Sequence, residues 1–233
     1  MHSTARLIIA LTITCLASAL ALAAIHGLTE APIQEQKRLA NLRAIEEVLP
    51  PFENDPVENT RQIVLEDDEV GAEKELTVYL GLQENEITGV AFPVYGEGYG
   101  GLIHVMVGIN LQEEISGVKI LEHLETPGLG AKIEESSFTD QFKSKSLENS
   151  LLVNGILAVT KDGGDLDALT GATISPRGVA MAVSAGLKIF NRHRHEILGL
   201  PQVQDTTEAA SPQADTSGTE SEKSREKEEA EVR

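Results

Sequence analysis

The chain has 233 residues and a net charge of −18 at pH 7, from 37 acidic and 19 basic side chains. Such a surface repels phosphate backbones and therefore argues against nucleic acid as a partner. Its one cysteine, Cys15, excludes a disulfide within the chain. We also expect no metal site, because no metal-ligand spacing connects His104, His123, His193 and His195.

The N-terminal region contains an uncharged stretch of 19 residues, LIIALTITCLASALALAAI, at positions 7–25. A helix rises about 1.5 Å per residue, so this stretch crosses nearly all of the ~30 Å hydrocarbon layer of a bilayer. The alternative is a cleaved signal peptide with small residues around Ala21, but its apolar region is usually only about 7–15 residues long. We expect an uncleaved anchor over residues 1–28, with Arg6 in the cytoplasm and the rest of the chain outside.

The next segments predict one domain of the α+β class. Residues 34–49 carry a leucine or isoleucine every three or four positions, which predicts an amphipathic helix that continues from the anchor and ends before Pro50. Four short runs rich in β-branched residues predict a mainly antiparallel sheet, at residues 76–80, 87–94, 101–109 and 115–121. We therefore expect a helix and linker over residues 29–75 and the domain over residues 76–197, with flanking helices.

The second half of the domain is predicted from its breakers and apolar spacing. Residues 122–132 contain proline and two glycines and predict a loop. Residues 133–143 predict a short helix with two phenylalanines on one face, and residues 154–160 predict a last strand. Residues 198–233 are rich in serine, threonine and glutamate and poor in apolar residues, so we expect a disordered acidic tail.

The final helix is expected to begin at Ser175, as N-cap, with Pro176 in the first helical position, and to end near His193. The segment DALTGATISPRG, residues 167–178, spans this start. Unpaired backbone N–H groups at a helix start attract anions. Small residues there let a phosphate approach the backbone, and hydroxyls can donate to it. Simple helix capping accounts for the same residues, so this pattern alone leaves both interpretations open.

A hydrolase that uses Thr173 as its nucleophile would need a base to take the hydroxyl proton. The nearby candidates are Asp162, Asp165 and Asp167, whose ordinary pKa near 3.9 makes them poor bases at neutral pH. The segment therefore favours a site that is modified by another enzyme over a hydrolytic centre.

Three motifs resemble known families. Residues 167–173, DALTGAT, resemble the D-x-x-[ST]-G-A-T flavinylation motif of the FMN-binding domain family. Residues 123–130, HLETPGLG, are similar to a loop of the G subunits of the Rnf ion-translocating oxidoreductase complex. Residues 98–101, GYGG, resemble a further segment of those subunits. The order and rough spacing of the three motifs match, and Thr170 stands where serine is frequent in relatives.

The resemblance implies a covalent cofactor. In that family a separate flavin transferase esterifies the last threonine of the motif to the phosphate of FMN, so the implied attachment residue is Thr173. The resemblance places around the phosphate Thr170, Gly171, Ala172 and Ser175. It implies a loop near the isoalloxazine made of Glu125, Thr126, Gly128, Leu129 and Gly130. Asp167 would belong to the surface that the transferase recognises.

The implied function is that of an electron-transfer subunit in a membrane-bound ion-translocating oxidoreductase, without turnover of its own. Its partners would be the other membrane subunits and the transferase, with the flavin domain on the periplasmic side of the bacterial inner membrane. One alternative is the related C subunit of a sodium-translocating NADH:quinone reductase, which shares the flavinylation motif. Another is a membrane-tethered binding or scaffold module without flavin.

Overall fold

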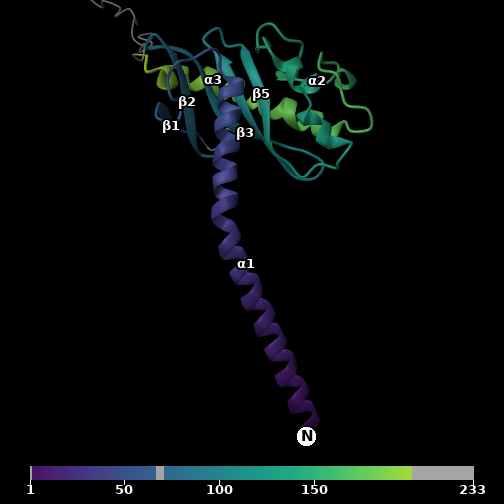
Figure 1. The fold of residues 1–233 in the computed structure, drawn as a ribbon. Helices are drawn as coiled ribbons and strands as arrows, with labels where there is room; N and C mark the ends of the chain where they lie inside the picture. The colour runs from purple at the N-terminus through teal and green to yellow at the C-terminus, as the bar shows by residue number, and fades with distance from the viewer. Residues whose placement is uncertain (1, 67–70, 201–233) are drawn as a thin grey trace, which may run out of the picture. The chain divides into compact units, whose positions relative to one another are not determined.

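The computed structural model describes residues 2–66 and 71–200 (Figure 1). Five antiparallel strands form one sheet in chain order: β1 Thr60–Val64, β2 Glu75–Gln83, β3 Glu86–Glu97, β4 Leu102–Asn110 and β5 Ile115–Glu122. The long helices are α1 (His2–Val48) and α3 (Ile174–Leu198). The predicted α+β class with a mainly antiparallel sheet is confirmed. The tail predicted as disordered lies, from residue 201 onward, outside the described residues.

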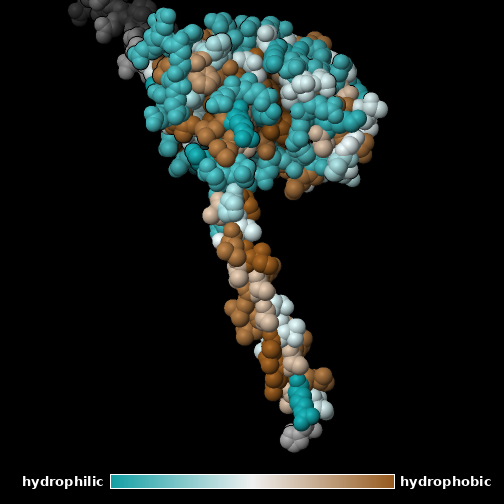
Figure 2. All heavy atoms as spheres, in the orientation of Figure 1, coloured by the Kyte–Doolittle hydropathy of each residue, from teal (hydrophilic) through white to brown (hydrophobic). Residues whose placement is uncertain are grey.

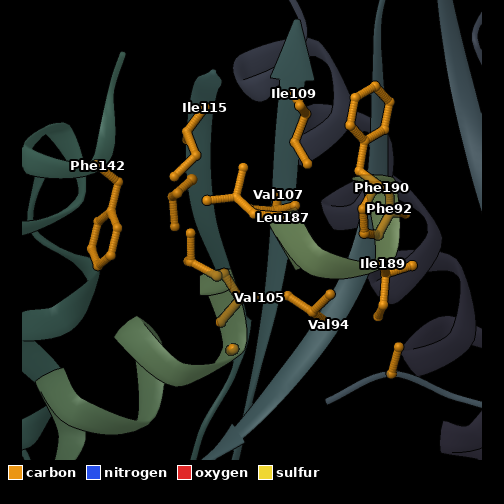
Figure 3. Close-up of a cluster of buried hydrophobic side chains, with 14 of the residues drawn as sticks. Phe92, Val94, Val105, Val107, Ile109, Ile115, Phe142, Leu187, Ile189 and Phe190 are labelled. Carbon is orange, nitrogen blue, oxygen red and sulfur yellow. The ribbon is translucent and has the colours of Figure 1, made fainter. Parts of the chain in front are cut away.

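The main core lies between the sheet and α3. Alternate residues of β3 contribute to it, since Val90, Phe92 and Val94 are buried against the apolar side of the helix. Figure 3 shows Phe92 and Val94 beside Phe190, Leu187 and Ile189 of α3. Burying one such side chain stabilises the fold by about 1.5–3 kcal/mol. This packing fixes the position of α3 on the sheet, and with it the position of its first turn.

The last turns of α1 cover part of the opposite face of the sheet, where Ile45 and Val48 pack against Ala91 and Met106. Gly108 of β4 faces Gly117 of β5 in the sheet register, and both lie directly under Val48. A side chain at either glycine would overlap the helix, so the pair forms a notch for the end of α1. The hydroxyl of Ser116 donates to the Val48 carbonyl oxygen at 2.6 Å and closes the helix end.

Upstream of this notch, α1 runs as one helix of 47 residues, which confirms that the amphipathic segment continues from the apolar stretch. Figure 2 shows mostly apolar side chains on the surface of its N-terminal half. Within the part of the chain that the structure describes, α1 is the one helix long and apolar enough to cross a membrane. Two ion pairs connect its C-terminal half to β5. Lys37 of α1 lies 3.2 Å from Glu122 of β5, and Lys119 of β5 lies 2.8 Å from Glu47 of α1.

The sequence pattern did not predict β1, which lies within residues 29–75, expected as helix and linker. The prediction of one helix over residues 133–143 was wrong. That segment, with the residues before it, forms three short helical turns: η1 Gly130–Glu134, α2 Ser136–Thr139 and η2 Asp140–Phe142. Extended backbone at Glu135 separates the first two. Phe138 and Phe142 are still buried together, with ring centroids 5.5 Å apart, so the apolar spacing reflected burial without a regular helix.

The single strand predicted over residues 154–160 is instead a small hairpin. β6 (Leu152–Val153) pairs with β7 (Ile156–Leu157), and Asn154 and Gly155 between them have φ values of 54° and 75°. Asn-Gly is the preferred pair for a two-residue hairpin turn because both residues tolerate positive φ. The short 3-10 helix η3 (Thr160–Asp162) follows and leads into the segment before α3.

Candidate functional site

The first turn of α3 differs from the prediction. The N-cap position is Thr173, whose side chain makes no capping bond, and the helix starts at Ile174. Ser175, expected as the N-cap, lies inside the first turn, where it is 1% exposed. Its hydroxyl donates to a carboxylate oxygen of Glu125 at 2.5 Å. Because a buried carboxylate needs hydrogen-bond donors, the Ser175 hydroxyl binds Glu125 and does not cap the helix. The helix also ends at Leu198, beyond His193.

Glu125 is itself 6% exposed and accepts two hydrogen bonds from neutral groups. Its Oε2 accepts from Ser175, and its Oε1 accepts from the backbone N–H of Gly100 at 2.9 Å. A side chain at Gly98 or Gly130 would overlap this carboxylate, so a substitution at either position would displace it. The carboxylate therefore joins the turn between β3 and β4, the loop after β5 and the start of α3.

His123 supports the same loop from outside. Its Nδ1 accepts a hydrogen bond from the backbone N–H of Glu125 at 3.0 Å, and its Nε2 lies 2.9 Å from Oε1 of Glu134. An accepting Nδ1 leaves the proton of a neutral ring on Nε2, where it can be donated to the Glu134 carboxylate. The imidazole thus bridges the loop to η1 and orients the backbone next to the buried carboxylate.

An open cavity of about 420 Å³ lies where these segments meet. Its lining consists of Tyr99, Glu125, Thr126, Leu129, Gly130, Gly171, Ala172, Thr173, Ile174 and Ser175. The structure therefore brings the predicted attachment threonine together with most of the loop that the resemblance placed near the flavin ring. Ligand cavities commonly hold about 300–1,000 Å³, and this one is within that range.

Three predicted site residues do not line the cavity. Thr170 and Gly128 are exposed, and each is a chain neighbour of a residue that lines the cavity. Asp167 is also exposed, and its backbone N–H donates to Gln141 Oε1 at 2.6 Å. Gly171 does line the cavity and has a φ of 82°, which favours glycine. The left-handed backbone there turns the chain between Thr170 and the start of α3.

The motifs did not identify the charged residues beside Thr173. Lys161 of η3 donates from Nζ to Thr173 Oγ1 at 2.8 Å. The next residue, Asp162, receives two hydrogen bonds from Arg177, one of them from Nε at 2.6 Å. These hydrogen bonds from Arg177 hold the pKa of Asp162 below its usual value, and the same pair raises the pKa of Arg177. The turn that carries Lys161 is thereby tied to the first turns of α3.

Apolar side chains form the other part of the cavity. Tyr99, Leu129 and Ile174 line it with exposed fractions of 73%, 46% and 47%. Tyr99 and Ile174 were not predicted as site residues, although Tyr99 belongs to the GYGG segment. The cavity wall thus combines the hydroxyl of Thr173, which accepts a hydrogen bond from Lys161, with flat and branched apolar side chains. That arrangement suits a ligand with an anionic end and an apolar body.

A larger cavity, about 720 Å³, lies beside α3 and is lined by residues that include Tyr95, Leu102, Met181 and Lys188. It contains neither Thr173 nor any residue of the loop after β5. We assign the candidate site to the smaller cavity, because the predicted attachment residue Thr173 and most of the loop after β5 line it.

Comparison with known proteins gives three findings. Residues 98–188 match the family described as FMN-binding domain. The chain is 37% identical over 187 residues to the G subunit of the ion-translocating oxidoreductase complex of Cereibacter sphaeroides, covering 78% of this chain and 82% of that protein. It is 34% identical over 180 residues to the protein of the same name from Aliivibrio fischeri, covering 76% of this chain and 85% of that one.

A solved structure, the C subunit of the Na(+)-translocating NADH-quinone reductase from Parabacteroides distasonis, superposes with a TM-score of 0.51 at 18% identity. The superposition covers 69% of this chain and 94% of that chain. At this identity the likeness concerns the fold alone.

Proposed function

The chain belongs to the family of G subunits of ion-translocating oxidoreductase complexes, and we propose that it carries FMN covalently, through a phosphodiester to Thr173. It is an electron-transfer subunit of a membrane complex, and its partners are other subunits of that complex. Bound flavin supplies the electron-transfer chemistry, while the protein holds and orients it.

The observation that carries the proposal is the position of Thr173 Oγ1. This oxygen lies at the cavity wall, at the N-terminus of a helix of 25 residues, and 2.8 Å from the ammonium of Lys161. A helix N-terminus carries about half a positive charge, so an esterified phosphate there gains favourable electrostatics from both the helix and the lysine. The residues present therefore fit the anionic end of FMN.

The apolar side of the cavity fits the other end of the cofactor. A tricyclic ring would meet the exposed faces of Tyr99, Leu129 and Ile174. Aromatic and branched apolar side chains favour a flat ring through burial of apolar surface. Glu125 also lines the cavity, and hydrogen bonds from Ser175 and from the backbone of Gly100 hold its carboxylate.

The proposal includes maturation and orientation. With Arg6 on the cytoplasmic side, the domain after α1 is periplasmic, and a flavin transferase attaches the cofactor there. A covalent bond suits this location because FMN lost outside the cytoplasm would not be replaced. Asp167 is exposed six residues before Thr173, in a position that an enzyme can reach. The first cytoplasmic residues and the exported domain are then joined by α1 alone.

The experiment compares three full-length chains, each produced in cells that contain a flavin transferase. Wild type and Thr60→Ala, an exposed threonine of β1 that does not line the cavity, should show in-gel flavin fluorescence after denaturation. Thr173→Ala should show none. Compared with unmodified wild type from cells that lack the transferase, it should melt at nearly the same temperature, because the Thr173 side chain makes no capping bond and its hydrogen bond from Lys161 is exposed. Flavin fluorescence from Thr173→Ala would mean that the cofactor is attached to another residue. Wild type without flavin fluorescence would favour the alternative of a scaffold module without flavin.

A further inference from the structure

A lysine outside the flavinylation motif, Lys161, donates a hydrogen bond to the proposed attachment residue. Lys161 is exposed on η3, and its Nζ donates to Thr173 Oγ1 at 2.8 Å, across twelve positions in the chain. An ammonium carries three donors, so this bond leaves Lys161 able to donate to further oxygens. The lysine thus meets the very oxygen that an ester would use.

The turn that presents Lys161 has a fixed shape. Gly163 ends η3 with a φ of 92°, a conformation that favours glycine. Gly164 follows, and a side chain there would overlap the backbone of Ala158. The backbone N–H of Thr160 donates to the Leu166 carbonyl oxygen at 2.7 Å and closes the turn. Together with the pair of Asp162 and Arg177, these contacts hold the base of the lysine in place.

The acidic neighbours in the turn are engaged by other cations. Asp162 binds Arg177 through two hydrogen bonds, and Asp165 lies 2.5 Å from the ammonium of Lys145. Lys161 has only the smallest of the effects that lower the pKa of Asp162. The hydrogen bond that Lys161 makes within the described residues is to Thr173 Oγ1.

We propose that Lys161 is the cationic residue that binds the phosphodiester once FMN is attached to Thr173. In esterification, Oγ1 bonds to the phosphorus of an activated flavin nucleotide that the transferase supplies, the anhydride bond to the leaving phosphate group breaks, and the hydroxyl proton is released. Oγ1 then becomes a weaker acceptor, with an anionic phosphate one bond away. The lysine donor then transfers from Oγ1 to the unesterified phosphate oxygens, where the hydrogen bond joins two opposite charges and is stronger. The proposal rests on the proposed attachment at Thr173 and adds a positioning role for a residue outside the motif.

The test uses phosphorus NMR of the flavin-modified full-length chain in detergent. It compares wild type, Lys161→Met, Lys161→Arg and a control, Lys143→Met, whose lysine pairs with Asp140 and does not line the cavity. In wild type, the phosphodiester resonance should differ from that of the same protein unfolded in denaturant. Lys161→Met should move it toward the unfolded position, while Lys161→Arg and the control keep it near wild type.

The time course of modification gives a second readout. Loss of a hydrogen bond to a charged group corresponds to about a tenfold change or more, so Lys161→Met should be modified about tenfold more slowly than the control. If Lys161→Met blocks attachment entirely and Lys161→Arg restores it, the proposal also stands. A Lys161→Met protein with the wild-type resonance and rate would overturn the role of Lys161 alone. A wild-type protein without any phosphodiester resonance would overturn the attachment at Thr173 itself.

Discussion

Ser175 in the first turn of α3 donates a hydrogen bond to the buried carboxylate of Glu125, fifty positions earlier in the chain, at 2.5 Å. This bond joins the segment that carries the proposed attachment threonine to the loop after β5. Each segment resembles a different known motif, and both line the candidate cavity. Within the cavity wall, this bond holds the loop and the start of α3 together.

Replacing Ser175 by alanine should therefore destabilise the protein. One oxygen of a carboxylate that is 6% exposed would lose its donor, and an unsatisfied buried acceptor costs about 1–3 kcal/mol. Denaturant unfolding of the full-length chain in detergent measures the loss. Ser136→Ala, at the exposed start of α2, is the control and should change stability little. Equal stability of the Ser175 and Ser136 variants would contradict the role assigned to the bond.

Gly100 is predicted to tolerate no side chain. A Cβ there would overlap the carbonyl oxygen of Leu124, which is backbone and cannot rotate away. Gly100→Ala should shift the loop, break the bond from the Gly100 N–H to Glu125 and lower both thermal stability and flavin attachment. Gly27→Ala is the matched control, because no atom outside its own helix lies within 4 Å and alanine favours helices. A Gly100→Ala protein that melts and labels like the control would show that this close approach is unimportant.

The ion pair of Asp162 and Arg177 predicts a pH dependence. Hydrogen bonds from Arg177 hold the pKa of Asp162 below its ordinary value of 3.8. A carboxylate whose pKa is lowered by folding adds stability that is complete above the ordinary pKa and is lost as the pH falls through the lowered one. Asp162→Asn should therefore melt below wild type at pH 7, and the difference should shrink as the pH falls below the ordinary pKa of the aspartate. A difference that persists unchanged in acid would exclude the ion pair as its cause.

The notch under α1 gives a prediction that separates fold from site. A Cβ at Gly117 would lie 2.8 Å from the Cα atom of Val48. Gly117→Val should push the last turns of α1 off the sheet at a cost of about 1–3 kcal/mol, as overpacking does. Limited proteolysis should cut residues 34–48 faster than in wild type, while flavin attachment at Thr173 continues because the cavity does not involve this notch. Unchanged proteolysis would contradict the tight contact.

The elements with strong local signals could be predicted from the sequence. The β-branched runs located β2 to β5, and apolar spacing located both long helices, because burial of one helix face or strand face leaves a regular pattern. β1 was not predicted because its sequence, TRQIV, is polar at three of its five positions. Only its pairing with β2 identifies it as a strand. For the hairpin of β6 and β7, the local signal is the turn pair Asn154 and Gly155.

The candidate site, like the fold, could be predicted from the sequence only in part. Local sequence indicated a helix start rich in hydroxyls and small residues, and the resemblance identified Thr173 within it and the loop from Glu125 to Gly130. Neither the local sequence nor the resemblance could show that Ser175 donates a hydrogen bond to Glu125, because this contact depends on how α3 packs on the sheet. Lys161 was missed for a related reason: it reaches Thr173 through the fold of the turn between them. Sequence spacing carries no information about such contacts.

Peptide mass spectrometry of the full-length chain, isolated from membranes of cells that contain a flavin transferase, tests the central claim most directly. The peptide that contains Thr173 should carry the mass of FMN less one water, and fragmentation should place that mass on Thr173 and on neither Thr170 nor Ser175. If every copy of this peptide is unmodified in cells where the transferase labels another known substrate, the covalent flavin account is contradicted.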